Sequence, residues 1–220
     1  MQTTSVLQHA IETSSIDLSR IHYPKVRKFL ADYQLSKPQD FAKLNSIGYD
    51  PSDTNYYEHL KTYSFKQNIN DVWNAYKTIR PDQVWSGSMV RFGMQYTRQE
   101  HNITYTDSTV YEGLKAGQLI ILNLRLLNGL FNLAVGHEIM DVNDKEKTIR
   151  ISYLENSASQ GSQFIKLTGT ADGNTQVTHK TLYKSGSWFR DKVLYPGLHT
   201  KAIGEFHGNV RKMLDGVARK

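Results

Sequence analysis

Hydrophobic and polar residues alternate along the second half of the chain. In residues 148–154 the apolar members of the alternation are Ile149, Ile151 and Tyr153, and in residues 175–184 one side carries Val177, His179, Thr181 and Tyr183. Successive side chains of a strand point to opposite faces of a sheet. Both segments therefore predict strands with one face toward a core and one face toward solvent.

Further strands are predicted where similar segments lie between turn-forming residues. They fall at residues 57–69, 89–96, 117–127, 133–142 and 163–170, with a weaker strand at 102–112. Asn128-Gly129 supplies the positive φ angles of a tight turn between two of them. The short connections predict an antiparallel meander.

Helical spacing dominates the end of the chain. After Pro196, which fits the first position of a helix, apolar residues recur at intervals of three and four: Leu198, Ala202, Ile203, Phe206, Val210, Met213, Leu214 and Val217. A shorter helix is predicted between Asn70, as its N-cap, and Pro81. The fold class predicted is α+β, with a curved antiparallel sheet wrapped around the long C-terminal helix.

The first 55 residues have a different pattern. Spacing at residues 6–11 predicts one short helix, and a second begins at Pro24 and ends by Ser36-Lys37-Pro38. The turn-forming residues 48–53 then mark a boundary. We therefore expect a helical N-terminal arm, residues 1–55, and a main domain, residues 56–220.

This order of elements resembles the START-like superfamily, also called SRPBCC, which contains lipid-transfer domains, pollen-allergen-like proteins and polyketide cyclases. Residues 63–73 (YSFKQNINDVW) look like its opening strand and Val-Trp helix, and residues 167–178 (LTGTADGNTQVT) look like one of its hairpins. Residues 187–190 and 211–214 are also similar to uncharacterised bacterial members. The resemblance covers residues 57–218 and implies a helix-grip fold with a cavity for sterols, acyl chains or aromatic molecules.

Composition and charge exclude several classes of protein. The 220 residues contain no cysteine, which excludes disulfides and thiolate chemistry, and no apolar run approaches the roughly 20 residues of a membrane span. The net charge is +6, with seven Lys or Arg against three Asp or Glu after residue 185. These basic residues are spread over several helical turns, which indicates a solvated face and no nucleic-acid partner. Without a secretory signal pattern, we expect a cytoplasmic protein.

Motifs of enzymes that use metals, nucleotides or a serine nucleophile are absent. The eight histidines have no His-Glu-x-x-His spacing, and His199 and His207 lie two helical turns apart. No phosphate loop, dinucleotide fingerprint or Gly-x-Ser-x-Gly elbow is present. His137-Glu138 is no catalytic pair, because neighbouring strand residues point to opposite faces. We expect no metal and no cofactor.

Candidate ligand-binding residues lie on the faces expected to point toward the C-terminal helix. They are His137, Tyr153, His179, Tyr183, Trp188, Tyr195 and Phe206. Apolar walls would supply affinity while histidines and tyrosines orient a ligand. The alternative interpretation is that these side chains are hydrogen-bonded core residues. Trp73 and Trp85 are expected to pack in the core.

The predicted function is binding or transport of a hydrophobic small molecule in a cavity between the sheet and the C-terminal helix. Two alternatives stay open. One is a cyclase- or dehydratase-type enzyme that uses His179 or His137 as acid or base; the other is a protein-interaction or membrane-surface module. No catalytic residue is assigned, and the ligand, the oligomeric state and the role of the arm are left open.

Overall fold

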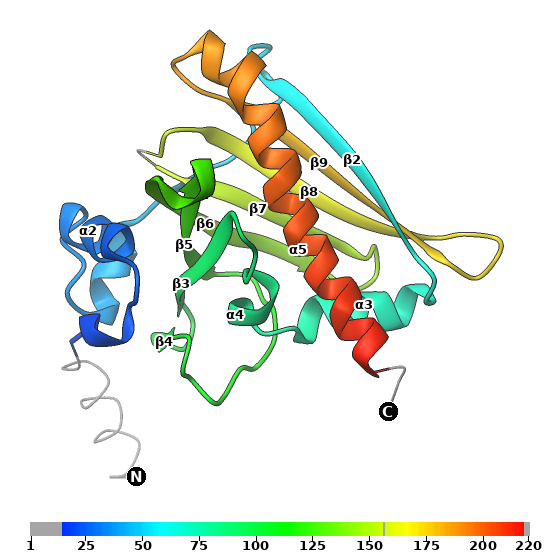
Figure 1. The fold of residues 1–220 in the computed structure, drawn as a ribbon, viewed down its shortest axis with the longest axis horizontal. Helices are drawn as coiled ribbons and strands as arrows, with labels where there is room; N and C mark the ends of the chain where they lie inside the picture. The colour runs from blue at the N-terminus through cyan, green and yellow to red at the C-terminus, as the bar shows by residue number, and fades with distance from the viewer. Residues whose placement is uncertain (1–14, 156, 218–220) are drawn as a thin grey trace.

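The computed structural model describes residues 15–155 and 157–217, which build a strongly curved antiparallel sheet around one long helix (Figure 1). Nine strands form the sheet in the order β2-β9-β8-β7-β6-β5-β3-β4, and β1 pairs with β7. In chain order the strands are β1 (Ser46–Ile47), β2 (Tyr57–Phe65), β3 (Val90–Thr97), β4 (Asn102–Thr104), β5 (Gln118–Leu126), β6 (Phe131–Asn143), β7 (Thr148–Leu154), β8 (Gln160–Gly169) and β9 (Thr175–Lys184).

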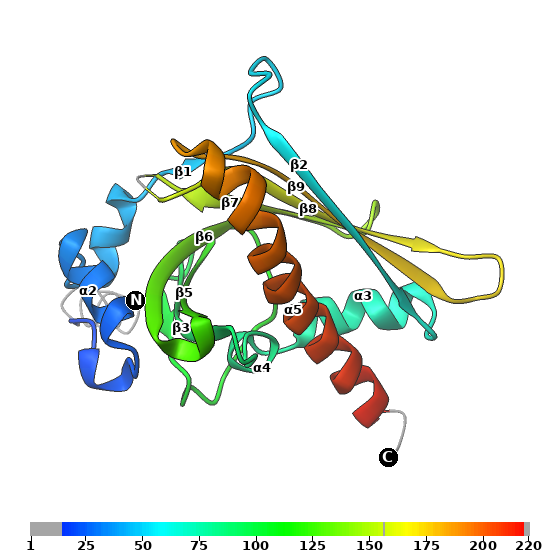
Figure 2. The same ribbon diagram turned by 45° about the horizontal axis from the view of Figure 1, so that its top comes forward.

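The longest helix, α5 (Tyr195–Val217), crosses the concave face of the sheet (Figure 2). The remaining helical elements are η1 (Leu18–Arg20), α2 (Pro24–Asp32), η2 (Pro38–Lys43), α3 (Ile69–Thr78), α4 (Pro81–Val84), η3 (Leu127–Gly129) and the π-turn η4 (Arg190–Leu194). The prediction of an α+β helix-grip fold is confirmed. None of the described helices is long and apolar enough to cross a bilayer.

Several element boundaries differ from the sequence prediction. Asn68 caps α3, not Asn70, because the Asn68 side chain accepts hydrogen bonds from the N–H groups of Asn70 and Asp71. The helix α4 was not predicted, and the strand expected at 102–112 has only three residues. The predicted helix at residues 6–11 lies outside the described residues.

Pro196 is not the first residue of the C-terminal helix. Helical backbone begins at Trp188, where the Ser187 hydroxyl accepts a hydrogen bond from the Arg190 N–H. A proline inside a helix has no N–H to donate and its ring crowds the preceding turn. The π-turn η4, in which the Tyr195 N–H reaches the Arg190 carbonyl, widens the helix immediately before this proline.

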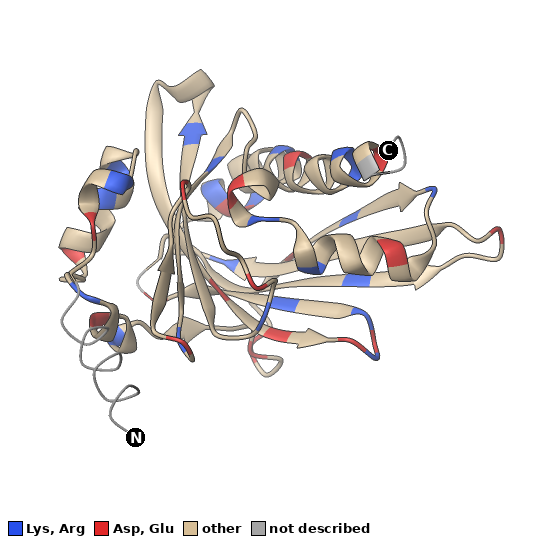
Figure 3. Ribbon diagram, turned by 90° about the horizontal axis from the view of Figure 1, so that it is seen from below, with Lys and Arg blue, Asp and Glu red and all other residues tan. Residues whose placement is uncertain are grey.

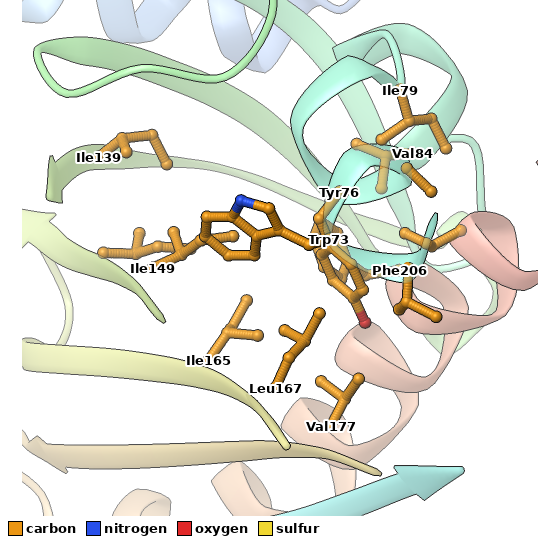
Figure 4. Packing of buried hydrophobic residues seen from close by; sticks show 14 of the residues in the cluster. Trp73, Tyr76, Ile79, Val84, Ile139, Ile149, Ile165, Leu167, Val177 and Phe206 are labelled. Carbon is orange, nitrogen blue, oxygen red and sulfur yellow. The ribbon is translucent and has the colours of Figure 1, made fainter. Parts of the chain in front are cut away.

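The inner core fills the end of the concave face that lies under α3 and α4. Trp73 and Tyr76 of α3 point between isoleucines of β7 and β8 and Phe206 of α5 (Figure 4). The Trp73 indole N–H also donates to Asp144, at 2.7 Å. Trp73 is therefore a core residue, as expected.

One carboxylate fastens α5 to the start of β3. Glu205 accepts hydrogen bonds from the Ser88 hydroxyl and from the backbone N–H groups of Ser88, Met89 and Val90, at 2.5–3.2 Å. These N–H groups lie just before β3 and at its first residue, and the Glu205 carboxylate is their hydrogen-bond acceptor. Partial burial raises the pKa of Glu205, but the hydrogen bonds from residues 88–90 outweigh it, so the pKa lies below its ordinary value.

The arm packs on the outer, convex face of the sheet. Its apolar residues in this contact are Ile16, Ile21, Val26, Phe29, Leu30, Leu35, Phe41 and Leu44. They meet Leu119 and Ile121 of β5, while Ile120 and Leu122 of the same strand face α5. This part of β5 is therefore buried on both faces, and the described arm lies on the opposite side of the sheet from α5.

Two features of the sheet admit the arm. A β-bulge at Gly93 interrupts the pairing of β3 with β5, so that Phe92 faces the inner core and Met94 the outer one. On the outer face Arg98 donates to the carbonyls of Phe41 and Leu44 and forms an ion pair with Glu138, at 2.7 Å. The arm is thus held by close packing and by hydrogen bonds from Arg98, which is itself ion-paired with Glu138 of β6.

The approach of the arm at Gly93 makes a stability prediction. A Cβ atom there would lie 2.8 Å from Val26 Cγ2 and 2.7 Å from the Ile121 carbonyl oxygen. We expect Gly93→Ala to lower the free energy of unfolding by about 1–3 kcal/mol, since overpacking forces the neighbours apart. Urea denaturation measures the change. Gly169→Ala in β8 is the control, because its new Cβ meets nothing closer than 4.0 Å; equal stability of the two variants would contradict the described packing.

Candidate functional site

A cavity of about 260 Å³ lies between the concave face of the sheet and the first half of α5. Its mouth lies between β6 and the start of the helix, where Leu133, Leu194 and Leu198 line the cavity and remain 49%, 45% and 38% exposed. The cavity occurs here because the inner core fills only the other end of the concave face.

One part of the cavity wall is apolar. It is formed by aliphatic side chains from β5, β6 and the start of β3, by Trp85, and by residues of α5 that face them. These side chains are Met89, Val90, Leu122, Leu124, Leu126, Leu133, Val135, Leu198, Ala202 and Ile203.

The other part of the wall is polar and comes from β6, β7, the connection from β7 to β8, β8, η4 and the start of α5. The side chains there are His137, Tyr153, Ser157, Ser159, Gln163, Arg190, Tyr195 and His199. A molecule in the cavity would therefore have hydrocarbon on the side of β3 and β5 and hydrogen-bonding groups on the side of β7 and β8.

A chain of hydrogen bonds runs from the inner core to this polar wall. Tyr76 contacts His207 at 2.5 Å, His207 contacts His179 at 2.9 Å, and His179 contacts the Gln163 side-chain oxygen at 2.9 Å. The Gln163 amide then donates to the Tyr153 hydroxyl at 3.4 Å, and Tyr153 is hydrogen-bonded to the Tyr195 hydroxyl. Only the last three members line the cavity.

The orientation of Gln163 fixes the direction of this chain. Its oxygen can only accept, so His179 Nε2 carries the hydrogen and His179 Nδ1 accepts from His207 Nε2. At the other end Tyr153 accepts from Gln163, and the two tyrosine hydroxyls share one bond. One of their two O–H hydrogens is therefore left for a partner in the cavity.

Aromatic stacking positions the start of α5. The Tyr195 ring stacks on Tyr183, with ring centroids 3.7 Å apart, and on His199, at 4.9 Å. His199 Nδ1 lies 3.1 Å from His59 Nδ1, while its Nε2 is buried without a hydrogen-bond partner. His59 is in turn bonded to Thr200, at 2.8 Å.

His137 faces the cavity without a hydrogen bond from any described residue. Its ring lies against Tyr153, with centroids 4.8 Å apart, and protein surrounds it, although its surface is accessible from the cavity. Burial penalises the imidazolium and lowers the pKa of His137 to about 4. The same cause lowers the pKa of His207 to about 3 and those of His59, His179 and His199 below the ordinary value.

The structure distributes the seven candidate ligand-binding residues over four environments. His137, Tyr153 and Tyr195 line the cavity. His179 and Tyr183 are buried behind its wall, where Tyr183 donates to the Asp191 carbonyl at 2.7 Å. Phe206 lines an adjoining hollow of about 40 Å³, whereas Trp188 is 63% exposed and lies outside both.

Among the aromatic and polar side chains that line the cavity, the sequence analysis did not assign Trp85, Gln163, Arg190 and His199 to the site. Trp85 was assigned to the core; it packs on Phe206, with centroids 4.6 Å apart, and also lines the cavity. Gln163 shares the inward alternation of Ile165 and Leu167, and His199 shares the helical face of Ala202 and Ile203. Extending both periodicities to polar residues would have identified these two side chains.

Glu138 is separated from the cavity, in agreement with the argument against a His137-Glu138 pair. It lies on the outer face, bonded to Arg98 and to the Ser46 hydroxyl. Within residues 15–155 and 157–217, no three or more His, Cys, Asp or Glu side chains are grouped so as to hold a metal ion.

Apart from the cavity and its adjoining hollow, a polar hollow of about 350 Å³ lies outside the inner core, beside the loop that follows β4. Its charged side chains are already paired: Arg20 with Asp107, and Lys115 with Glu100 and Glu112, all at 2.7 Å. The apolar cavity is therefore the better candidate for a small-molecule site.

Comparison with known proteins identifies the fold. No known family pattern matches the sequence, and no curated protein is recognisably related to it. Among solved structures, KanY protein is 16% identical and superposes with a TM-score of 0.52 over 74% of this chain and 99% of its own. Major latex-like protein 151 from Panax ginseng is 12% identical, with a TM-score of 0.50 over 72% and 97%. These identities establish a shared fold alone.

The buried histidines predict a loss of stability in acid. Their pKa values are lowered on folding, so the stability that neutral rings contribute is fully present above about pH 6.5, the ordinary histidine value, and is lost as the pH falls toward 4. Each such histidine adds about 1.4 kcal/mol per pH unit to the change of the unfolding free energy with pH. Urea denaturation between pH 7.5 and 4.5 should show this dependence, and His137→Gln should reduce its slope by about 1.4 kcal/mol per pH unit, the contribution of one proton. A flat profile would contradict the burial of these rings.

Proposed function

We propose that this chain, which has the helix-grip fold of the START-like superfamily, binds a compact hydrophobic molecule in the cavity between the sheet and α5. The observation that carries the proposal is the division of the cavity wall into an aliphatic part and a polar part. Such a wall supplies affinity through buried apolar surface and orientation through a few hydrogen-bonding groups.

The size of the cavity restricts the ligand. About 260 Å³ is close to the lower end of the range, about 300–1,000 Å³, that is typical of small-molecule sites. A medium-length acyl chain or an aromatic molecule of two or three rings fits this range better than a lipid with two chains. Burial of a CH₂ group contributes about 0.8 kcal/mol, so a ten-carbon chain gains about 8 kcal/mol before the cost of association.

In this proposal the ligand contacts His137, Tyr153 and Tyr195 among the residues predicted from sequence. His179 and Tyr183 support that wall from behind, through Gln163 and through the stacked Tyr195 ring. Phe206 borders the adjoining hollow, and Trp188 takes no part.

A cyclase- or dehydratase-type enzyme is the second candidate, and the accessible ring of His137 is the observation in its favour. His179 is less suitable, because both of its ring nitrogens are hydrogen-bonded within the protein. A pKa of about 4 makes His137 neutral but only weakly basic at pH 7, where a general base works best with a pKa near the working pH. Its chemistry therefore favours accepting a hydrogen bond over removing a proton.

Filling the cavity tests the binding function. N-phenyl-1-naphthylamine, a neutral fluorescent molecule of three rings, should bind with a stoichiometry of one and gain fluorescence. Ala202→Phe places a ring inside the cavity and should weaken binding at least tenfold. The matched control Ala31→Phe changes an exposed residue of α2 and should leave the affinity unchanged. Absence of binding by the wild-type protein, or equal binding by Ala202→Phe, would refute the proposal.

A further inference from the structure

The polar part of the cavity wall contains one charged side chain among the described residues, that of Arg190. No described acidic group lies within 4.0 Å of its guanidinium, and its Nε is buried without a hydrogen-bond partner. A guanidinium is always charged and only donates hydrogen bonds. An unpaired cation that lines a cavity is complementary to an anion.

Arg190 forms no ion pair with the neighbouring acidic residue, Asp191. That residue is buried and does not line the cavity; one of its carboxylate oxygens accepts a hydrogen bond from the Ser185 N–H at 2.8 Å, and the other is buried without a partner. Among other nearby cations, Lys184 is paired with Asp53, and Lys192 is exposed beside Trp188. The charge that faces the cavity is therefore that of Arg190.

Several neutral groups on the same part of the wall can also donate. The tyrosine pair Tyr153–Tyr195 has one O–H hydrogen left over, and the hydroxyls of Ser157 and Ser159 line the cavity. His199 Nε2 is buried and unpartnered, and it donates when His199 Nδ1 accepts from His59. A buried polar atom without a partner destabilises the protein, and a ligand oxygen would supply the partner.

We infer that the ligand is an amphiphile with a carboxylate head, such as a medium-chain fatty acid or an aromatic carboxylic acid. This inference rests on the proposed binding function and specifies its ligand. The head lies between Arg190, His199 and the tyrosine pair, and the tail points toward β5 and β3. A carboxylate is favoured over a doubly charged phosphate because the wall offers one cation for one negative charge.

The inference is tested with two ligands that differ only in the head group, decanoate and decan-1-ol. Isothermal titration calorimetry at pH 7.5 should show decanoate binding at least tenfold more tightly to the wild-type protein. Arg190→Gln should abolish this preference by weakening decanoate and leaving decan-1-ol unchanged. Arg190→Lys, which keeps the charge, should retain part of it.

Lys192→Gln is the matched control, because it removes the same charge two residues away from an exposed side chain that does not line the cavity. It should preserve the preference for decanoate, and equal melting temperatures should confirm that all variants are folded. Equal affinities of the wild-type protein for the two ligands, or an unchanged preference in Arg190→Gln, would overturn the carboxylate inference alone. Failure of both ligands and of N-phenyl-1-naphthylamine to bind would overturn the binding function itself.

Discussion

The structure depends on the contact between α5 and the concave face of the sheet. Phe206, Val210 and Leu214 bury the later part of the helix in the inner core. Glu205 fastens the same region to the N–H groups of residues 88–90. The first turns of the helix lie over the cavity instead and are positioned by the stack of Tyr183, Tyr195 and His199. Because only the later part of α5 packs directly into the core, its first turns leave the space between the helix and the sheet that forms the cavity.

The sequence predicted the architecture because its clearest patterns coincide with the strands and helices of the structure. Alternation over 175–184 matches β9, and proline at position 24 marks the start of α2. Asn128-Gly129 forms the expected turn, with φ angles of 58° and 95°. Basic and acidic positions are interspersed over the helices and strands (Figure 3).

The errors have local physical causes. Pro196 is typical of a helix start, but a π-turn lets the helix continue through it. The role of the arm was left open, and the apolar run Leu119–Leu122, which the structure buries on both faces, has no alternation that marks an outer face for the arm. Gln163 and His199 were missed because the periodicities of residues 163–170 and of the C-terminal helix were applied to apolar residues alone, and Arg190 lies in the π-turn, outside both periodicities. Two of these side chains retain buried atoms without partners, which no periodicity reveals.

The double burial of β5 has a mechanical consequence. The arm braces the convex side through Val26 at Gly93 and through Arg98 at the Phe41 and Leu44 carbonyls, so the curvature of this part of the sheet is supported from outside. Opposite it, the cavity is closed by the π-turn and the first turns of α5, with exposed side chains at Trp188, Phe189 and Val193. The two sides of the cavity are therefore supported unequally. Under the proposed binding function, a ligand larger than the cavity would displace the start of α5, while the braced part of the sheet would keep its shape.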